Sequence, residues 1–437
     1  MSIDINLIRE CKGGEPQDII ESEKKRFKDI KYIDDLIELD KEWRKEKYKL
    51  DSIRYEYNTL NTEIGNKKKI SKGKDTCEQE ISKIKKIEED INKQLAIVTQ
   101  LANKLDELLK RIGNVVHESV PVSNDEKNNK IERTWGETKE DHKLDSTLGH
   151  LHYKEVLKLL DACEFERGIR ITNTHSYFLK GVGVLLSQAL VNYTLNFLAE
   201  HNYILIQTPF FIKETLMSQI SNTDQFFKIT AEKTFKDMNL ITSPEQPLAL
   251  FHSNEWVKEA ELPLCYAGYA SCFNKKVNSY NQYEKIIQFC FTKPEDSWQM
   301  HETMISIAEK YYASLGLPYR VLNIVSGRLS NAVAKEYALI SGDYNLVSCV
   351  NYTDYVSRGL SIRCGTKRVT ELEKRYTHIL NCRLCSIQHC ISRILEYYQT
   401  PKGLKVPKVL VKYMGGIEFI PYKEELLKSF TAKSNDK

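Results

Sequence analysis

A heptad repeat between residues 36 and 112 limits, more than any other feature, what this chain of 437 residues can fold into. Apolar side chains recur every seven positions, first at Leu36, Trp43, Leu50, Tyr57 and Ile64, and then at Cys77, Ile84, Ile91, Val98, Leu105 and Ile112. A second apolar seam runs beside each series and is interrupted at Glu46 and Glu88. Two seams with this spacing are typical of long helices that pack as a coiled coil.

The two series are separated by a segment that suits a turn. Residues 65–74 hold two glycines and five lysines, which are Lys67, Lys68, Lys69, Lys72 and Lys74. This composition favours a solvated loop. The sequence therefore predicts an antiparallel helical hairpin with a basic tip, in which each helix has roughly 30 residues and a length of roughly 45 Å. A scaffold or dimerisation coiled coil and an arm that binds nucleic acid are both compatible with this pattern.

Beyond the hairpin the pattern becomes mixed. Residues 124–130 are typical of a polar linker, and an apolar helical pattern at 183–200 is followed by short strand-like runs such as 286–291. Neither G-x-G-x-x-G nor G-x-x-x-x-G-K-[ST] occurs, so the sequence holds neither of these glycine-rich phosphate loops. We expect a helical arm at residues 1–120 and an α+β domain with a largely antiparallel sheet at residues 121–437.

Composition and the first residues indicate a cytoplasmic protein. No run of about 18 apolar residues occurs, so the sequence predicts no membrane span. Residues 1–5 carry an acid and no apolar core with basic flanks, which predicts no secretory or transit signal. The eleven cysteines are then most simply reduced thiols, and the net charge of +4 is too small to indicate a nucleic-acid partner by itself.

A series of short stretches agrees in order and spacing with a known pattern. These stretches are residues 113–126, 242–247, 251–256, 268–273, 317–320, 325–327, 346–349, 362–365 and 394–399. Together they resemble the seryl-tRNA synthetases, and within that family the cytosolic, fungal-type enzymes. The likeness extends over nearly the whole chain.

The resemblance implies a class II aminoacyl-tRNA synthetase fold, in which helices flank an antiparallel sheet. It implies a homodimer that forms through a first motif at residues 183–211, with the motif's proline at Pro209. It also implies that the helical arm binds serine tRNA. We therefore assign the five lysines of the hairpin tip to tRNA binding.

The resemblance further implies where ATP would bind, and two of those positions hold other residues. At the position of Asn274 the family has an arginine that holds the α-phosphate of ATP. At the position of Lys276 it has a glutamate that recognises adenine. The neighbouring Lys275 can attract phosphate, but a lysine cannot reproduce the planar fork of an arginine. The loop that follows is also markedly shorter than in the family.

The serine and magnesium positions differ as well. A serine-contacting glutamate of the family is Ile287 here, and a magnesium-binding glutamate is Asn345, although Ser348 is retained. A neutral amide attracts a hard dication less than a carboxylate does. An inserted proline separates Thr242 from Glu245, which predicts that Glu245 is rotated out of register or that the loop bulges.

The third motif shows the same kind of change. Its arginine, which faces the γ-phosphate in the family, is His389, and Arg393 lies one helical turn further, about 6 Å along the axis. Arg383 stands where a small residue lines the serine pocket of the family. We retain Lys275 and Arg393, together with Thr242, Glu245 and Ser348, as candidate remnants of a ligand site.

A zinc site is an alternative use of this segment. His378, Cys382, Cys385 and His389 include a Cys-x-x-Cys pair with flanking histidines, which can bind metal. Their offsets are those of one helix face, and four ligands along a straight helix cannot surround one ion. We therefore expect no metal site and interpret these residues as buried side chains.

From these replacements the sequence predicts a pseudoenzyme: a non-catalytic paralogue that binds serine tRNA or has a regulatory role, with no catalytic residues and no cofactor. ATP and magnesium binding are expected to be lost or weak. Two alternatives stay open: an interaction partner of the authentic synthetase, and a synthetase-fold protein that binds a different small anion through Lys275, Lys276 and Arg383. A still-active serine–tRNA ligase is the least favoured interpretation.

Overall fold

The structure is a computed structural model that describes residues 3–70, 77–136, 150–172, 176–221, 224, 226–230, 237–275, 282–366 and 375–435. It divides into two compact units, Ser2–Val115 and Val116–Lys437. The sequence places this boundary slightly later, after residue 120. Lys72, Lys74 and Lys276, which the sequence assigns to the tip and to the second motif, lie outside the described residues.

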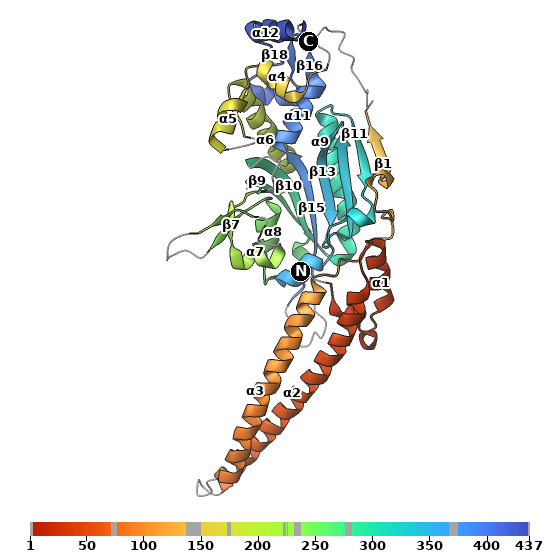
Figure 1. Ribbon diagram of the computed structural model, residues 1–437, viewed down its shortest axis with the longest axis vertical. Helices are drawn as coiled ribbons and strands as arrows, with labels where there is room; N and C mark the ends of the chain where they lie inside the picture. Colours follow the sequence, from red (N-terminus) through yellow and green to blue (C-terminus); the bar gives the residue numbers. More distant parts are fainter. Residues whose placement is uncertain are drawn as a thin grey trace. The chain divides into compact units, whose positions relative to one another are not determined.

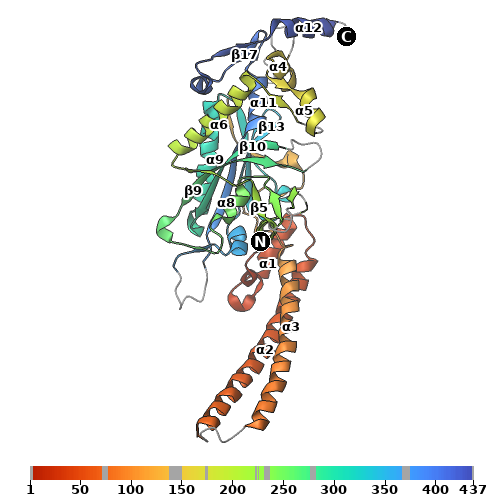
Figure 2. The same cartoon turned by 90° about the vertical axis from the view of Figure 1, so that its left-hand side faces the viewer.

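The N-terminal unit is a helical hairpin, as the heptad repeat predicts (Figures 1 and 2). Its elements are the 3-10 helices η1 (Ile5–Ile8) and η2 (Glu10–Lys12) and the α-helices α1 (Pro16–Lys25), α2 (Lys31–Ile70) and α3 (Glu78–Leu109). α2 has 40 residues and continues through Lys67, Lys68 and Lys69, where the sequence predicts the turn. Lysines in the last turn interact favourably with the negative end of the helix dipole, which explains why the helix extends that far.

The two acidic residues that interrupt the seam are satisfied by bonds across the hairpin. Glu46 on α2 accepts a hydrogen bond from Gln94 Nε2 on α3 at 2.7 Å. Glu88 on α3 accepts one from the hydroxyl of Tyr57 on α2 at 2.9 Å. Because each acid finds a donor on the opposite helix, the interruptions do not break the coiled coil.

The second unit is built on one eight-stranded sheet with the strand order β1-β11-β12-β13-β15-β10-β9-β4. Its strands are β1 (Lys130–Trp135), β4 (Ile204–Gln207), β9 (Leu264–Phe273), β10 (Gln282–Thr292), β11 (Tyr319–Asn323), β12 (Lys335–Ser341), β13 (Tyr344–Asn351) and β15 (His378–Ser386). β4 and β9 run parallel, and the other neighbouring pairs run antiparallel. The predicted α+β fold with a largely antiparallel sheet is confirmed.

Helices cover both faces of this sheet and form two apolar cores. The larger core receives side chains from α4 (Tyr153–Leu159), α6 (Val182–Glu200), α9 (Ser297–Ser314) and α11 (Ile387–Tyr398). The second core, on the opposite face, receives them from α7 (Glu214–Ile220), α8 (Glu245–Phe251) and α10 (Tyr355–Leu360). By length and composition α6 could cross a membrane, but its Leu186, Leu190 and Leu198 are buried in the core of this unit.

Smaller elements surround the large sheet. They are the helices α5 (Phe165–Thr172) and α12 (Glu424–Asn435), the 3-10 helices η3 (Glu126–Asn128), η5 (Glu259–Glu261), η6 (Pro294–Asp296), η7 (Ser326–Arg328) and η8 (Lys408–Met414), and the strands β2 (Cys163–Glu164), β3 (Phe178–Leu179), β5 (Phe211–Lys213), β6 (Lys228–Ile229), β7 (Met238–Leu240), β8 (Trp256–Val257), β14 (Arg363–Cys364), β16 (Gln399–Thr400), β17 (Gly403–Lys405) and β18 (Phe419–Pro421). These strands form four small sheets. The site described below is built on the long strands β9, β10, β12, β13 and β15 of the large sheet.

Candidate active site

Three neighbouring strands bring charged and polar side chains to one face of the large sheet. Arg383 in β15 lies opposite Ile287 in β10 and opposite Ser348 in β13, and Lys285 is two residues before Ile287. Directly paired residues point to the same face of a sheet, as do residues two apart in one strand. Because Ile287 belongs to the core that α8 helps to form, Lys285, Arg383 and Ser348 share the face on which α8 packs.

Two half-buried carboxylates lie on this face. Glu245, the first residue of α8, accepts hydrogen bonds from the Tyr352 hydroxyl and, at 2.8 Å, from Asn381 Nδ2. Glu336 in β12 accepts one from Ser348 Oγ at 2.6 Å. Burial raises the pKa of both carboxyl groups, and the hydrogen bonds from Tyr352 and Ser348 offset part of that rise. Both carboxylates are therefore held by hydroxyl and amide donors.

Lys285 is a half-buried cation on the same face. Its Nζ donates to the carbonyl oxygen of Thr242 at 3.0 Å and lies 4.9 Å from the centre of the Tyr283 ring. Burial lowers the pKa of Lys285 to about 8. Of the groups that face it, Cys272 on β9 and Glu245 on α8 raise this pKa, whereas Arg383 on β15 lowers it.

Arg383 is held by Asn345, which stands at the position of the family's magnesium-binding glutamate. Its Nη2 donates to Asn345 twice, to the backbone oxygen at 3.2 Å and to Oδ1 at 3.1 Å. Its Nε is buried and has no acceptor among the residues that the structure describes. His389 lies in the first turn of α11, where burial lowers its pKa and the positive charges of Arg383 and Lys285 lower it further. Three basic side chains therefore share one neighbourhood.

The loop before α8 accommodates its proline. Pro244 is the N-cap residue of α8, and the side chain of Gln246 closes the turn by accepting from the backbone N–H of Thr242 at 2.9 Å. A Cβ atom on Gly268 would lie 3.1 Å from Pro244 Cβ, a tight contact, so glycine at this position of β9 lets the loop pack closely. The segment thus directs Glu245 to Tyr352 and Asn381, as described above.

Other positions that the sequence singles out lie near the end of β9 or in the core. Asn274 is half-buried directly after β9, and Lys275 is exposed, with its Nζ 3.4 Å from the backbone oxygen of Asp224. Ile287 is fully buried in the second core, where its Cγ1 would lie 3.2 Å from a Cβ atom on Gly268. The place that the family gives to a serine-contacting glutamate is therefore apolar here.

Arg393 does not join the three basic residues. Its Nε donates to Ser341 Oγ at 2.9 Å, and its guanidinium lies 5.2 Å from the centre of the Tyr397 ring. This places it at the turn between β12 and β13. The helical spacing from His389 suggested that Arg393 could reach the ligand face, but its side chain is held at the turn by Ser341.

The four candidate zinc ligands occupy two kinds of element. His378, Cys382 and Cys385 lie in β15, and His389 lies in α11. Within the described parts of the chain, histidines, cysteines and acids form no group of three or more that could hold a metal ion. The three free cysteines of this segment are buried, Cys390 included.

Sequence reasoning missed four residues of the site: Lys285, Glu336, Tyr352 and Asn381. Lys285 had a signal that could have identified it, because it directly precedes the strand-like run 286–291. A charged residue at the edge of a buried strand needs a partner or a ligand. Glu336, Tyr352 and Asn381 have no comparable local signal, since their role depends on strands that are distant in the sequence.

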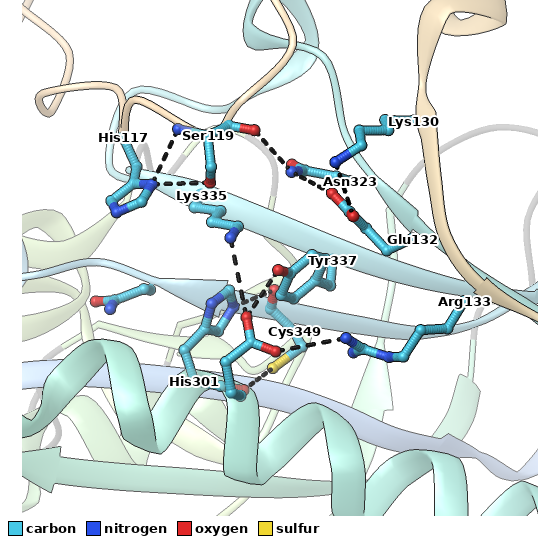
Figure 3. A network of polar contacts seen from close by, with 12 residues as sticks. His117, Ser119, Lys130, Glu132, Arg133, His301, Asn323, Lys335, Tyr337 and Cys349 are labelled. Atoms are coloured by element: carbon cyan, nitrogen blue, oxygen red, sulfur yellow. Dashed lines mark hydrogen bonds and ion pairs between the residues drawn. The ribbon is translucent and has the colours of Figure 1, made fainter.

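A second polar cluster lies on the other face of β12 and is separate from the site (Figure 3). His301 on α9 stacks on Tyr337, with ring centres 5.0 Å apart, and Lys335 Nζ lies 4.4 Å above the same ring. The Tyr337 hydroxyl donates to Glu302 at 2.7 Å. Burial lowers the pKa of His301 to about 4. Because Glu336 lies between Lys335 and Tyr337 in the strand, it points to the opposite face.

Comparisons with known proteins agree along the whole chain. The model of the "Seryl-tRNA synthetase N-terminal domain" matches residues 2–116, and that of the "tRNA synthetase class II core domain (G, H, P, S and T)" matches residues 227–398. The serine–tRNA ligase of Helianthus annuus is 42% identical over 98% of this chain and 100% of its own length. The chain belongs to the seryl-tRNA synthetase family.

Solved structures of family members have the same fold. The cytoplasmic serine–tRNA ligase of Naegleria fowleri in complex with AMP aligns with a TM-score of 0.85 and 37% identity, covering 97% of this chain and 100% of that one. The seryl-tRNA synthetase of Pyrococcus horikoshii complexed with ATP aligns with a TM-score of 0.82 and 30% identity, with the same coverage. The class II synthetase fold is therefore shown.

These findings correct the function that the sequence predicts. The expectation of a non-catalytic paralogue without a cofactor is wrong, because the relatives that match over nearly the full length are serine–tRNA ligases and the solved ones bind AMP or ATP. The same findings overturn the two alternatives, an interaction partner and a binder of another small anion. Physically, the replacements at Asn274, Ile287 and Asn345 leave the face charged, because Lys285 and Arg383 still point to it.

Proposed function

We propose that the chain is a cytoplasmic serine–tRNA ligase, which activates serine with ATP and transfers it to serine tRNA. The observation that carries this proposal is the 42% identity to a serine–tRNA ligase over 98% of the chain, which includes both units. In the first step the serine carboxylate attacks the α-phosphorus of ATP, the bond to the bridging oxygen breaks, and pyrophosphate leaves. In the second step a terminal hydroxyl of the tRNA attacks the serine carbonyl, and AMP leaves.

The charged face of the large sheet is where we assign this chemistry. Negative charge grows on the phosphates as pyrophosphate leaves, and fixed cations stabilise it. Lys285 and Arg383 supply such cations on one face. Magnesium that accompanies ATP prefers oxygen ligands. Glu336 and Ser348, which lie 2.6 Å apart and near Arg383, offer a carboxylate and a hydroxyl oxygen that fit it.

ATP–pyrophosphate exchange tests the proposal. We expect exchange that requires both serine and magnesium, and none when alanine replaces serine, because a site that bonds the serine hydroxyl rejects an amino acid without it. Chelation of magnesium should stop the exchange. A preparation that is folded by circular dichroism and still shows no exchange above the serine-free blank would contradict the proposal.

We further propose that the hairpin binds tRNA through the end of α2. Lys67, Lys68 and Lys69 are exposed there, and Lys67 also pairs with Glu80 on α3. Lysine clusters bind nucleic acid mainly through phosphates, and this makes the affinity depend on salt. Lys72 and Lys74 add to the same cluster in the sequence.

Replacing Lys67, Lys68 and Lys69 by alanine should weaken tRNA binding. Because each phosphate contact contributes roughly 0.7 to 0.9 to the slope of log affinity against log salt, the loss of three contacts should flatten that slope by roughly 2. Filter binding at several salt concentrations measures both quantities. The control replaces three exposed lysines of the second unit, Lys402, Lys405 and Lys408. Equal effects of both triple variants would contradict a specific role of the arm.

We also propose that two copies of the chain form a homodimer through residues 183–211. Large apolar side chains are exposed along this segment: Val184 (42%), Leu185 (46%), Ile204 (57%), Leu205 (45%), Phe210 (36%) and Phe211 (49%). β4, which contains two of them, is an edge strand of the large sheet. Contiguous exposed apolar surface beside an open sheet edge is typical of an interface.

A further inference from the structure

The two cations of the site form no salt bridge within the described residues, although the charge of Glu245 acts on Lys285 and that of Arg383 acts on Glu336. Lys285 donates to a backbone oxygen of Thr242, and Arg383 donates to both oxygens of Asn345. The nearby carboxylates, Glu245 and Glu336, are bonded to hydroxyl and amide donors. A half-buried charge that is not directly paired with a carboxylate is costly, so such a pair of cations is suited to an anionic ligand.

Arg383 is also oriented for a ligand. A guanidinium has five N–H donors in one plane, and the two bonds to Asn345 use only Nη2. Within the described part of the chain its Nε is buried without an acceptor, which is unfavourable unless a ligand oxygen accepts its hydrogen bond. Asn345 thus fixes one end of the fork and leaves a buried donor on the side of Nε.

Phosphate is the ligand chemistry that suits this arrangement. Arginine binds phosphate through two parallel N–H···O bonds, and a lysine nearby adds a point charge. His389 also lies close enough for Arg383 and Lys285 to lower its pKa. Neither Asn274 nor a neutral His389 can supply a permanent positive charge, although the resemblance implies arginines at both positions.

We propose that Arg383, oriented by Asn345, binds the phosphates of ATP together with Lys285. These two cations thereby take the role of the arginines that the resemblance implies at the positions of Asn274 and His389. The inference rests on the proposed function and identifies the residues that make it possible. Arg383 is then a catalytic residue, and Asn345 is a positioning residue that acts through it. Two replacements, that of the family's glutamate by Asn345 and that of its small residue by Arg383, are then one coupled change.

Arg383→Met tests the proposal. We expect the dissociation constant of ATP, measured by calorimetry on the full chain, to rise at least about 10-fold, as for the loss of a charge-assisted hydrogen-bond pair. Exchange should fall at least about 100-fold, as when one group that stabilises developing charge is removed. Arg383→Lys should restore only part of the affinity, because lysine lacks the planar fork. The control is Arg320→Met, at an exposed arginine of β11.

A double-mutant cycle tests the positioning role of Asn345. Asn345→Ala should weaken ATP binding in the wild-type background and change little in the Arg383→Met background, because the two residues act as one unit. Additive effects would contradict the positioning role. A purely structural role would instead lower the denaturation midpoint of both backgrounds equally and leave their ATP affinities the same.

Inorganic pyrophosphate separates this inference from the proposed function. If the wild type shows no exchange but binds pyrophosphate, and Arg383→Met weakens that binding, the catalytic proposal fails and the phosphate site stands. If exchange is present and both Arg383→Met and Arg383→Lys bind ATP and pyrophosphate like the wild type, the phosphate site is refuted and the ligase proposal stands. Near-ultraviolet circular dichroism of each variant shows that the comparison is between folded proteins.

Discussion

Lys285→Met should make the protein more stable and nearly inactive at the same time. The methionine keeps the length of the side chain and removes a half-buried charge whose pKa burial lowers to about 8, from an ordinary value of 10.5. Allowing for partial exposure, such a shift corresponds to roughly 1 to 3 kcal/mol of unfolding free energy gained by the variant at neutral pH. The Thr242 carbonyl stays bonded, because the Tyr283 hydroxyl also donates to it at 3.0 Å.

The stability gain should depend on pH in a defined direction. Between pH 8 and 10.5 the unfolded chain still holds the Lys285 proton that the folded protein has lost, so wild-type stability rises with pH in this window. The advantage of Lys285→Met is therefore complete below pH 8 and disappears as the pH approaches 10.5. Urea denaturation at a series of pH values, with both proteins in parallel, measures it.

The same substitution should lower ATP–pyrophosphate exchange at least about 100-fold, because it removes one cation from the developing charge on the phosphates. Lys310→Met, at an exposed lysine of α9, is the control and should change neither stability nor exchange. A variant that is less stable than the wild type would show that the bond to Thr242 outweighs the cost of burial. Retained exchange would remove Lys285 from the catalytic residues.

The hairpin could be predicted because its signal is local. A repeat of seven fixes which residues of each helix meet, whatever the rest of the chain does. What the pattern could not supply was the partner of each polar interruption. Glu46 and Glu88 leave the coiled coil intact only because Gln94 and Tyr57 donate hydrogen bonds to them from the opposite helix.

The site could be predicted only in part, because its residues meet through strand register. Comparison of single positions with the family pattern treats Asn345 and Arg383 as two separate losses. In the structure their side chains are hydrogen-bonded to each other, and Arg383 lies opposite Ile287, which is another replaced position. A change that involves two neighbouring strands cannot be recognised one position at a time, and this is why the sequence predicted a pseudoenzyme.

Leu185→Asp combined with Ile204→Asp should convert a dimer into a monomer. Both side chains are close to half exposed in the single chain, at 46% and 57%, and both lie in the segment that we assign to the homodimer. A carboxylate buried without a partner costs several kcal/mol, so the dissociation constant should rise at least about 100-fold. Sedimentation velocity should then show a particle of 50.8 kDa in place of one of twice that mass.

The opposite edge of the same sheet offers a matched control. Ile131 lies in β1, which is the other edge strand, and it is 52% exposed. Ile131→Asp adds the same charge to a comparable edge position, and we expect the dimer to persist. Dissociation by Ile131→Asp as well would show that charge alone, and not the surface formed by α6 and β4, controls assembly. A wild-type chain that sediments as a monomer at micromolar concentration would refute the interface at 183–211 altogether.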